Sequence, residues 1–119
     1  MQYNNTIMPS NSAVAFKASF DAKFLNAADA YYQKMNSPAK YKQFCSAVRR
    51  FAEVPNSDHI TIRYNKGFAN GKPSHMLYAS ENGKDVLLTA KDQFRKLLDK
   101  FSYMNEYEFK LKTGLIKKQ

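Results

Sequence analysis

The sequence has little of the residue types that staple small proteins or build metal centres. Its 119 residues include one cysteine, Cys45, two histidines, His59 and His75, and no tryptophan. A single cysteine excludes an internal disulfide and is typical of a reducing, cytoplasmic setting. The histidines lie far apart in the chain, and with one cysteine they match no zinc-site spacing. We therefore expect no disulfide, no metal and a fold that depends on its hydrophobic core.

Catalytic motifs are missing as well. Gly67 and Gly71 lie in one polar segment, but no Gly-Lys-Ser or Gly-Lys-Thr follows them, so the chain has no phosphate-binding loop. No nucleophile-elbow pattern occurs, and the acidic residues are too few and too scattered to predict a two-metal nuclease cluster. We expect a protein without enzymatic activity and without a cofactor.

The chain also lacks long apolar runs and is poor in acidic residues. No stretch approaches the roughly 20 apolar residues of a transmembrane helix, and no signal-peptide pattern opens the chain. We therefore expect no membrane contact and a cytoplasmic protein, in the host cytoplasm if it is viral. Lys and Arg number 19 against 10 Asp and Glu, for a formal net charge of +9. By charge alone the partner is anionic: a nucleic acid, an acidic protein or an anionic membrane surface.

Hydrophobic periodicity divides the chain into helices and strands. Apolar side chains recur every three or four residues early in the chain, where Ser37-Pro38 marks the start of a second helix. The period then changes to two, and Asn82-Gly83 is the strongest short signal for a hairpin. Residues 65–73, with two glycines, are expected to form a loop. The predicted elements are helices over 16–35 and 38–51, strands over 60–64, 74–80 and 86–88, a helix over 94–101 and a strand over 107–111.

The order α-α-β-β-β-α-β predicts a single α+β domain with a mostly antiparallel sheet that does not close into an OB barrel. We assign residues 1–12 to a flexible N-terminal arm and residues 13–113 to the globular domain. Residues 114–119 are a basic C-terminal tail.

Aromatic residues, nine Phe and eight Tyr, exceed what a small core needs. Proteins that hold single strands combine cations for the phosphates with flat rings on which bases stack. The segment from Arg63 to Tyr78 mixes both types, and Phe68 stands out because it lies in the polar loop beside Gly67. Glycine there lets the backbone approach a ligand closely. The candidate nucleic-acid-binding residues of this segment are Arg63, Tyr64, Lys66, Phe68, Lys72, His75 and Tyr78.

Each of these candidates has a structural alternative. Tyr64 shares the strand face of Ile62, so it belongs to the core more readily than to a stacking surface. Phe68 fits equally well as a loop anchor that folds back onto the core. His75 and Tyr78 fall on opposite faces of their strand, so at most one of them faces a ligand.

The second predicted helix carries a basic cluster away from its apolar stripe. Lys42, Arg49 and Arg50 are candidates for a phosphate track that continues the surface of the Arg63–Tyr78 segment, and a solvated outer face is the alternative. On the first helix, Tyr31 and Tyr32 point about 100° apart, so both cannot be central to one core. Tyr32 is therefore a candidate exposed aromatic, for a base or for a second subunit.

In its size, basic charge and content of Tyr and Phe, the whole chain resembles the small single-stranded-DNA-binding cofactors with which certain lytic bacteriophages bring a phage RNA polymerase to DNA. The resemblance rests on no short motif and assigns no functional residues. It implies a non-OB fold, no enzymatic activity and an RNA polymerase as partner.

The sequence thus predicts a non-enzymatic protein that binds single-stranded nucleic acid in phage-type transcription or replication, with DNA preferred and RNA as the alternative. A homo-oligomer is also expected, because single-strand binding is often cooperative and the aromatics of the first helix suit a symmetric interface. The alternative class is a protein-interaction module, an inhibitor or adaptor for an acidic partner protein. Duplex reading by the second helix ranks lower, because its basic residues suit phosphates rather than base edges.

Overall fold

The computed structural model describes residues 18–117, except for the side chains of residues 90 and 91. The predicted arm, residues 1–12, lies outside the described residues, and so do the last two residues of the predicted tail, 114–119. The elements within the described range are β1 (Ser19–Phe20), α2 (Ala22–Met35), α3 (Pro38–Ala52), β2 (Thr61–Ala69), β3 (Lys72–Glu81), β4 (Lys84–Asp92), α4 (Phe94–Tyr103) and α5 (Glu106–Thr113).

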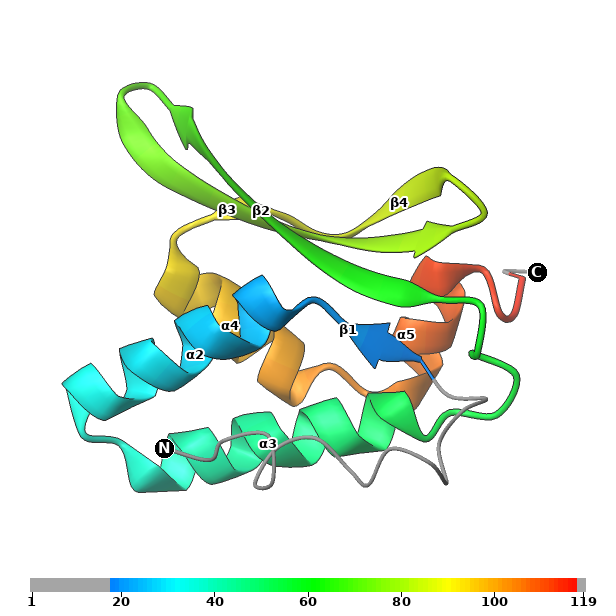
Figure 1. The fold of residues 1–119 in the computed structure, drawn as a ribbon, viewed down its shortest axis with the longest axis horizontal. Helices are drawn as coiled ribbons and strands as arrows, with labels where there is room; N and C mark the ends of the chain where they lie inside the picture. Colours follow the sequence, from blue (N-terminus) through cyan, green and yellow to red (C-terminus); the bar gives the residue numbers. More distant parts are fainter. Residues whose placement is uncertain (1–17, 118–119) are drawn as a thin grey trace.

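The described chain is arranged in layers, with one sheet above the helices (Figure 1). The strand order is β1-β2-β3-β4, with β1 parallel to β2 and the other neighbours antiparallel. All four helices lie below one face of the sheet, and α3 forms the layer farthest from it (Figure 1). The predicted α+β class is confirmed, as are the single domain, the mostly antiparallel sheet and the absence of a closed barrel within the described residues.

The first six predicted elements occur in the predicted order, but the seventh, expected to be a strand, is the helix α5. Asn105 starts this helix by accepting a hydrogen bond from the Glu108 N–H (2.8 Å), and Gly114, with φ of 82°, ends it. The alternation of apolar residues was misleading because only Phe109 among them is buried. Two ion pairs four residues apart stabilise the exposed side: Glu106–Lys110 (2.9 Å) and Glu108–Lys112 (3.4 Å).

The first helix begins later than its apolar spacing predicts. Phe20 belongs to the short strand β1, and Asp21 caps α2 by accepting a hydrogen bond from the Lys23 N–H (2.9 Å). The second oxygen of the Asp21 carboxylate accepts the Tyr64 N–H of β2 (3.3 Å). One side chain therefore ends the strand pairing and starts the helix.

Helix α2 buries two faces, because it lies between the sheet and α3. Tyr32 packs against Phe44 of α3 with ring centroids 5.7 Å apart, and Tyr31 packs edge-on against Phe94 of α4 at the same distance. Tyr32 is buried and Tyr31 is half-buried, so the expectation that Tyr32 is exposed was wrong. Because Tyr32 is buried, it is not available for the subunit interface that was predicted on the first helix.

The predicted loop over residues 65–73 is the end of a long β2–β3 hairpin. Asn70 and Gly71 both have positive φ, 55° and 76°, which is the geometry of a two-residue type I′ turn. Ala69 and Lys72 pair directly on either side of that turn. The hairpin therefore continues as regular sheet to its tip, and it curves away from the helices (Figure 1).

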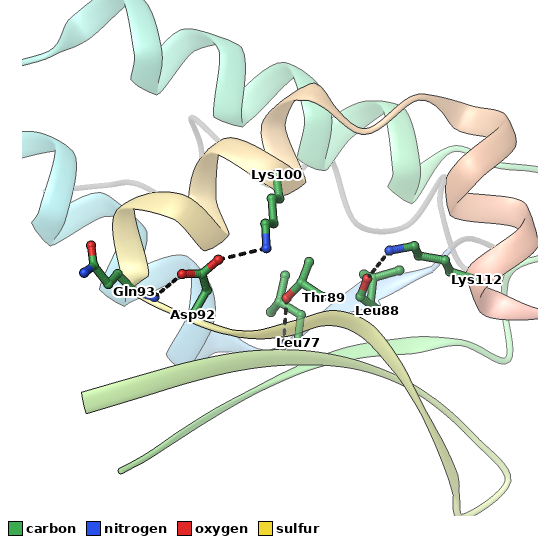
Figure 2. Close-up of polar contacts among 7 residues, drawn as sticks. All are labelled: Leu77, Leu88, Thr89, Asp92, Gln93, Lys100 and Lys112. Carbon is green, nitrogen blue, oxygen red and sulfur yellow. Dashed lines mark hydrogen bonds and ion pairs between the residues drawn. The ribbon is translucent and has the colours of Figure 1, made fainter. Parts of the chain in front are cut away.

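Side chains from the helices fix the irregular end of β4 (Figure 2). The ladder between β3 and β4 shifts register beside Leu77, where the Thr89 hydroxyl accepts a hydrogen bond from the Leu77 N–H (3.2 Å). Lys112 of α5 donates to the Leu88 carbonyl (3.1 Å), and Lys100 of α4 pairs with Asp92 (2.8 Å). The ammonium groups of Lys112 and Lys100 therefore stabilise the fold through contacts within the chain.

Candidate nucleic-acid interface

The sheet has one face packed on the helices and one face that none of the described helices covers (Figure 1). Ile62 and Leu77 are fully buried on the helix side. Because side chains alternate along a strand, their neighbours Arg63 and Tyr78 project from the opposite, open face.

A row of side chains crosses three strands on this open face. Arg63 of β2 pairs with Tyr78 of β3, and Tyr78 pairs with Leu87 of β4. Arg63 is exposed, Tyr78 is half-buried and Leu87 is 47% exposed. A cation, an aromatic ring and an aliphatic side chain thus stand side by side, and we name this set the open-face row.

The ring of Tyr78 is held along its own strand. Its hydroxyl donates to the sulfur of Met76, two residues back on the same face (3.3 Å). Asn65 of β2 pairs with Met76, so an exposed side-chain amide flanks the row. A tyrosine ring on an open sheet, with an amide and a cation beside it, has the parts that sheet-based single-strand binders use to stack and hydrogen-bond a base.

The tip of the β2–β3 hairpin carries the most exposed large apolar side chain that the structure describes. Phe68 is 73% exposed and pairs across the hairpin with Pro73. Lys66 and Lys72 lie on either side of Phe68 along the hairpin and are exposed. Neither lysine makes an ion pair with any described residue, so both charges are available to an anion. The alternative that Phe68 folds back onto the core is wrong.

Tyr64 and His75 form a packed pair on the helix side of the sheet. The Tyr64 hydroxyl lies 2.6 Å from His75 Nδ1, and the two rings stack with centroids 5.8 Å apart. Phe94 covers the imidazole at 5.0 Å. His75 is only 9% exposed, so it is not available to a ligand, and the core interpretation of Tyr64 is the one that the structure supports.

Burial changes the pKa of both rings in this pair. It lowers the pKa of His75 below its usual value, with a further contribution from the charge of Lys66, and it raises the pKa of Tyr64. The imidazole is therefore neutral near pH 7, and we assign the phenol as donor and Nδ1 as acceptor. Tyr64 and His75 thus anchor the base of the hairpin and take no direct part in the surface.

The basic cluster of the second helix does not join this surface. Lys42, Arg49 and Arg50 lie on α3, which the middle layer of helices separates from the sheet (Figure 1). The predicted phosphate track from the hairpin to these three residues is therefore wrong, because the chain places the two basic regions on opposite sides of the molecule.

Arg50 also has a structural role on α3. Its guanidinium donates to the backbone carbonyls of Ser102 (3.4 Å) and Met104 (3.1 Å) at the C-terminus of α4. It also lies 4.9 Å above the ring of Phe51. Lys42 and Arg49 are exposed.

Three residues of the open face were missed by sequence reasoning: Asn65, Met76 and Leu87. Asn65 has the same strand parity as Arg63, so alternation with buried Ile62 places it on the open face. Leu87 has no such signal, because the register of β4 shifts beside it and the sequence does not show the irregularity.

The described residues hold no group of three or more His, Cys, Asp or Glu side chains able to bind a metal ion. Among the helices of residues 18–117, none is both long and apolar enough to cross a bilayer. No family model matches the chain, and no curated protein or solved structure shows significant similarity to it.

Proposed function

We propose that the protein is a non-enzymatic binder of single-stranded nucleic acid, with DNA as the first ligand. The strand follows the open-face row and the tip of the β2–β3 hairpin. The observation that carries the proposal is the pairing of Arg63 with Tyr78 on the uncovered face of the sheet. Lys72 lies farther along the same face, and the exposed Lys66 and Phe68 project from the other face of the hairpin near its tip.

The chemistry of this surface favours a single strand over a duplex. Cations alone bind either form through the phosphates, with an affinity that falls as salt rises. Exposed rings add stacking worth about 1–3 kcal/mol per base, and only unpaired bases offer their faces for it. Tyr78 on the open face and Phe68 on the other face at the hairpin tip supply two such rings. Arg63 and Lys72 on the open face, and Lys66 beside Phe68, are the cations for the phosphates.

The proposed setting is phage-type transcription or replication, with an RNA polymerase as protein partner. The support for the setting and the partner is the resemblance in size, charge and aromatic content to the phage cofactors. The open sheet face supports the binding activity independently of that resemblance.

A fluorescence-anisotropy titration tests the proposal, with labelled single-stranded DNA, duplex DNA and RNA compared at several salt concentrations. We expect the single strands to bind more tightly than the duplex. Tighter binding to RNA than to DNA of the same sequence would indicate contacts to the 2′-hydroxyl. RNA would then be the ligand of the same surface.

A protein-interaction module remains the second candidate because Val86 and Leu87 are 44% and 47% exposed on β4. The two side chains point to opposite faces of this edge strand, and large exposed apolar side chains at a sheet edge are typical of protein contacts. Replacement of Leu87 by Ser separates the candidates, because it should abolish a pull-down of an acidic partner but only weaken oligonucleotide binding.

A further inference from the structure

A groove lies between α3 and the C-terminal end of α4, on the helix side of the molecule. Its volume is about 470 Å³. It is lined by two cations, two serines, an amide, an alanine and a tyrosine: Ala39, Lys42, Gln43, Ser46, Arg50, Ser102 and Tyr103. We call it the α3–α4 groove.

The α3–α4 groove is electropositive. Lys42 makes no ion pair with any residue between 18 and 117, and the described lining includes no carboxylate. Arg50 uses one terminal nitrogen on the carbonyls at the end of α4, which fixes the guanidinium in place. An arginine has five N–H donors, so donors remain for an anion in the groove.

Tyr103 forms an exposed wall of the groove and is held in one orientation. Its hydroxyl donates to Gln43 Oε1 across the groove at 2.6 Å, while the residue as a whole is 62% exposed. The hydrogen bond restricts the ring without covering it. A restrained, exposed ring loses little entropy when a flat partner stacks on it.

We propose that the α3–α4 groove is a second binding site for the single strand, where Lys42 and Arg50 hold a phosphate and Tyr103 stacks against the neighbouring base. This inference rests on the proposed function, because it assigns a second contact to the same class of ligand. In this second site Lys42 binds a phosphate, although it lies far from the hairpin.

The groove suits a nucleotide better than an acidic peptide. Carboxylate side chains need only the cations, and they gain nothing from an exposed ring. A nucleotide uses both features, since it carries a phosphate and a base on the same sugar. Because the groove and the open-face row lie on opposite sides, one short oligonucleotide occupies one site and a second copy occupies the other.

The test counts oligonucleotides per chain. Hexathymidylate is titrated into the full chain at low salt, and the complexes are counted by native mass spectrometry and by calorimetric stoichiometry. We expect two bound copies for the native chain and one for the double variant Lys42→Gln, Tyr103→Ala. The control is Lys84→Gln, Tyr107→Ala, which removes the same charge and an equally exposed tyrosine (62%) outside the groove and should keep two copies.

A third variant, Tyr103→Phe, keeps the ring and loses only the hydrogen bond to Gln43, so it should retain two copies. If the groove variant binds as many copies as the native chain, with unchanged affinity, the groove is not a site, although the proposed function stands. If the native chain binds no hexathymidylate, both the groove and the proposed function fail. All the substituted side chains are exposed, so circular dichroism should show folded protein in every case.

Discussion

Arg63 and Tyr78 stand directly opposite each other in the β2–β3 ladder, on the face of the sheet that the described helices leave open. A phosphate beside the guanidinium places the adjoining base within reach of the phenol ring. This pair is the centre of the proposed binding surface.

Removal of the ring at Tyr78 should weaken single-strand binding with little effect on the fold. The Tyr78→Ala variant loses one stacking partner, so we expect its dissociation constant for single-stranded DNA to rise about five- to 150-fold. Duplex binding should change much less, because duplex bases cannot stack on the ring. Anisotropy titrations give both constants. Tyr107→Ala, on the exposed side of α5, is the control, and an equal loss in that variant would remove the special role of Tyr78.

The two hairpins of the sheet provide a matched test of charge. Lys72 follows the Asn70-Gly71 turn and Lys84 follows the Asn82-Gly83 turn, so the two lysines occupy equivalent positions. We expect Lys72→Gln to reduce the slope of log affinity against log salt by about 0.7, the value for one phosphate contact with a single strand. Lys84→Gln should leave the slope unchanged. Equal slopes for both variants would show that only the net charge matters.

Acidification should destabilise the protein through His75. Burial lowers the pKa of His75 in the folded chain below the 6.5 of an unfolded histidine. The unfolded state therefore binds the proton first, and the free energy of unfolding should fall as the pH drops below about 6.5, until the folded imidazole is itself protonated. Urea denaturation between pH 7.5 and 5 measures this.

The substitution His75→Gln keeps a hydrogen-bonding side chain beside Tyr64 and cannot titrate, so its stability should depend less on pH in that window. If the pH dependence of stability is the same in His75→Gln as in the native chain, His75 is not its source.

The docking of α5 depends on one stacked pair of rings. Phe109 of α5 and Phe51 of α3 are both fully buried, and their rings are nearly parallel with centroids 4.5 Å apart. Phe109→Ala should lower the free energy of unfolding by about 3–5 kcal/mol, as other buried Phe truncations do. Chemical denaturation measures the loss. A change below about 1 kcal/mol would mean that α5 contributes little to the core.

Much of the fold could be predicted from local signals. The change of period near Ile60 and the Asn82-Gly83 dipeptide correctly predicted β2, β3, β4 and one turn, whereas β1 was not predicted. The same dipeptide at Asn70-Gly71 was the missed sign of the second hairpin. The helix α5 was missed because its alternating apolar residues outweighed the capping signals of Asn105 and Gly114.

The candidate site could be predicted only in part. Strand alternation correctly places Tyr78 and His75 on opposite faces of β3, because this rule depends only on neighbouring residues. The separation of α3 from the sheet, and the double burial of α2 that hides Tyr32, depend on how the helices stack. The stacking of the helices depends on contacts between residues far apart in the sequence. The sequence pattern therefore predicted one surface for the hairpin and the basic residues of α3, which the fold places on opposite sides.

The proposed function requires that the open sheet face bind unpaired bases in preference to paired ones. Its most direct test is the ratio of dissociation constants for a single strand and for a duplex of the same sequence, measured at about 50 mM salt for the native chain, where phosphate contacts are least screened. We expect tighter single-strand binding by the native chain, and a ratio closer to one in Tyr78→Ala. Equal or tighter binding to the duplex, or no binding to either ligand, would contradict the proposed function.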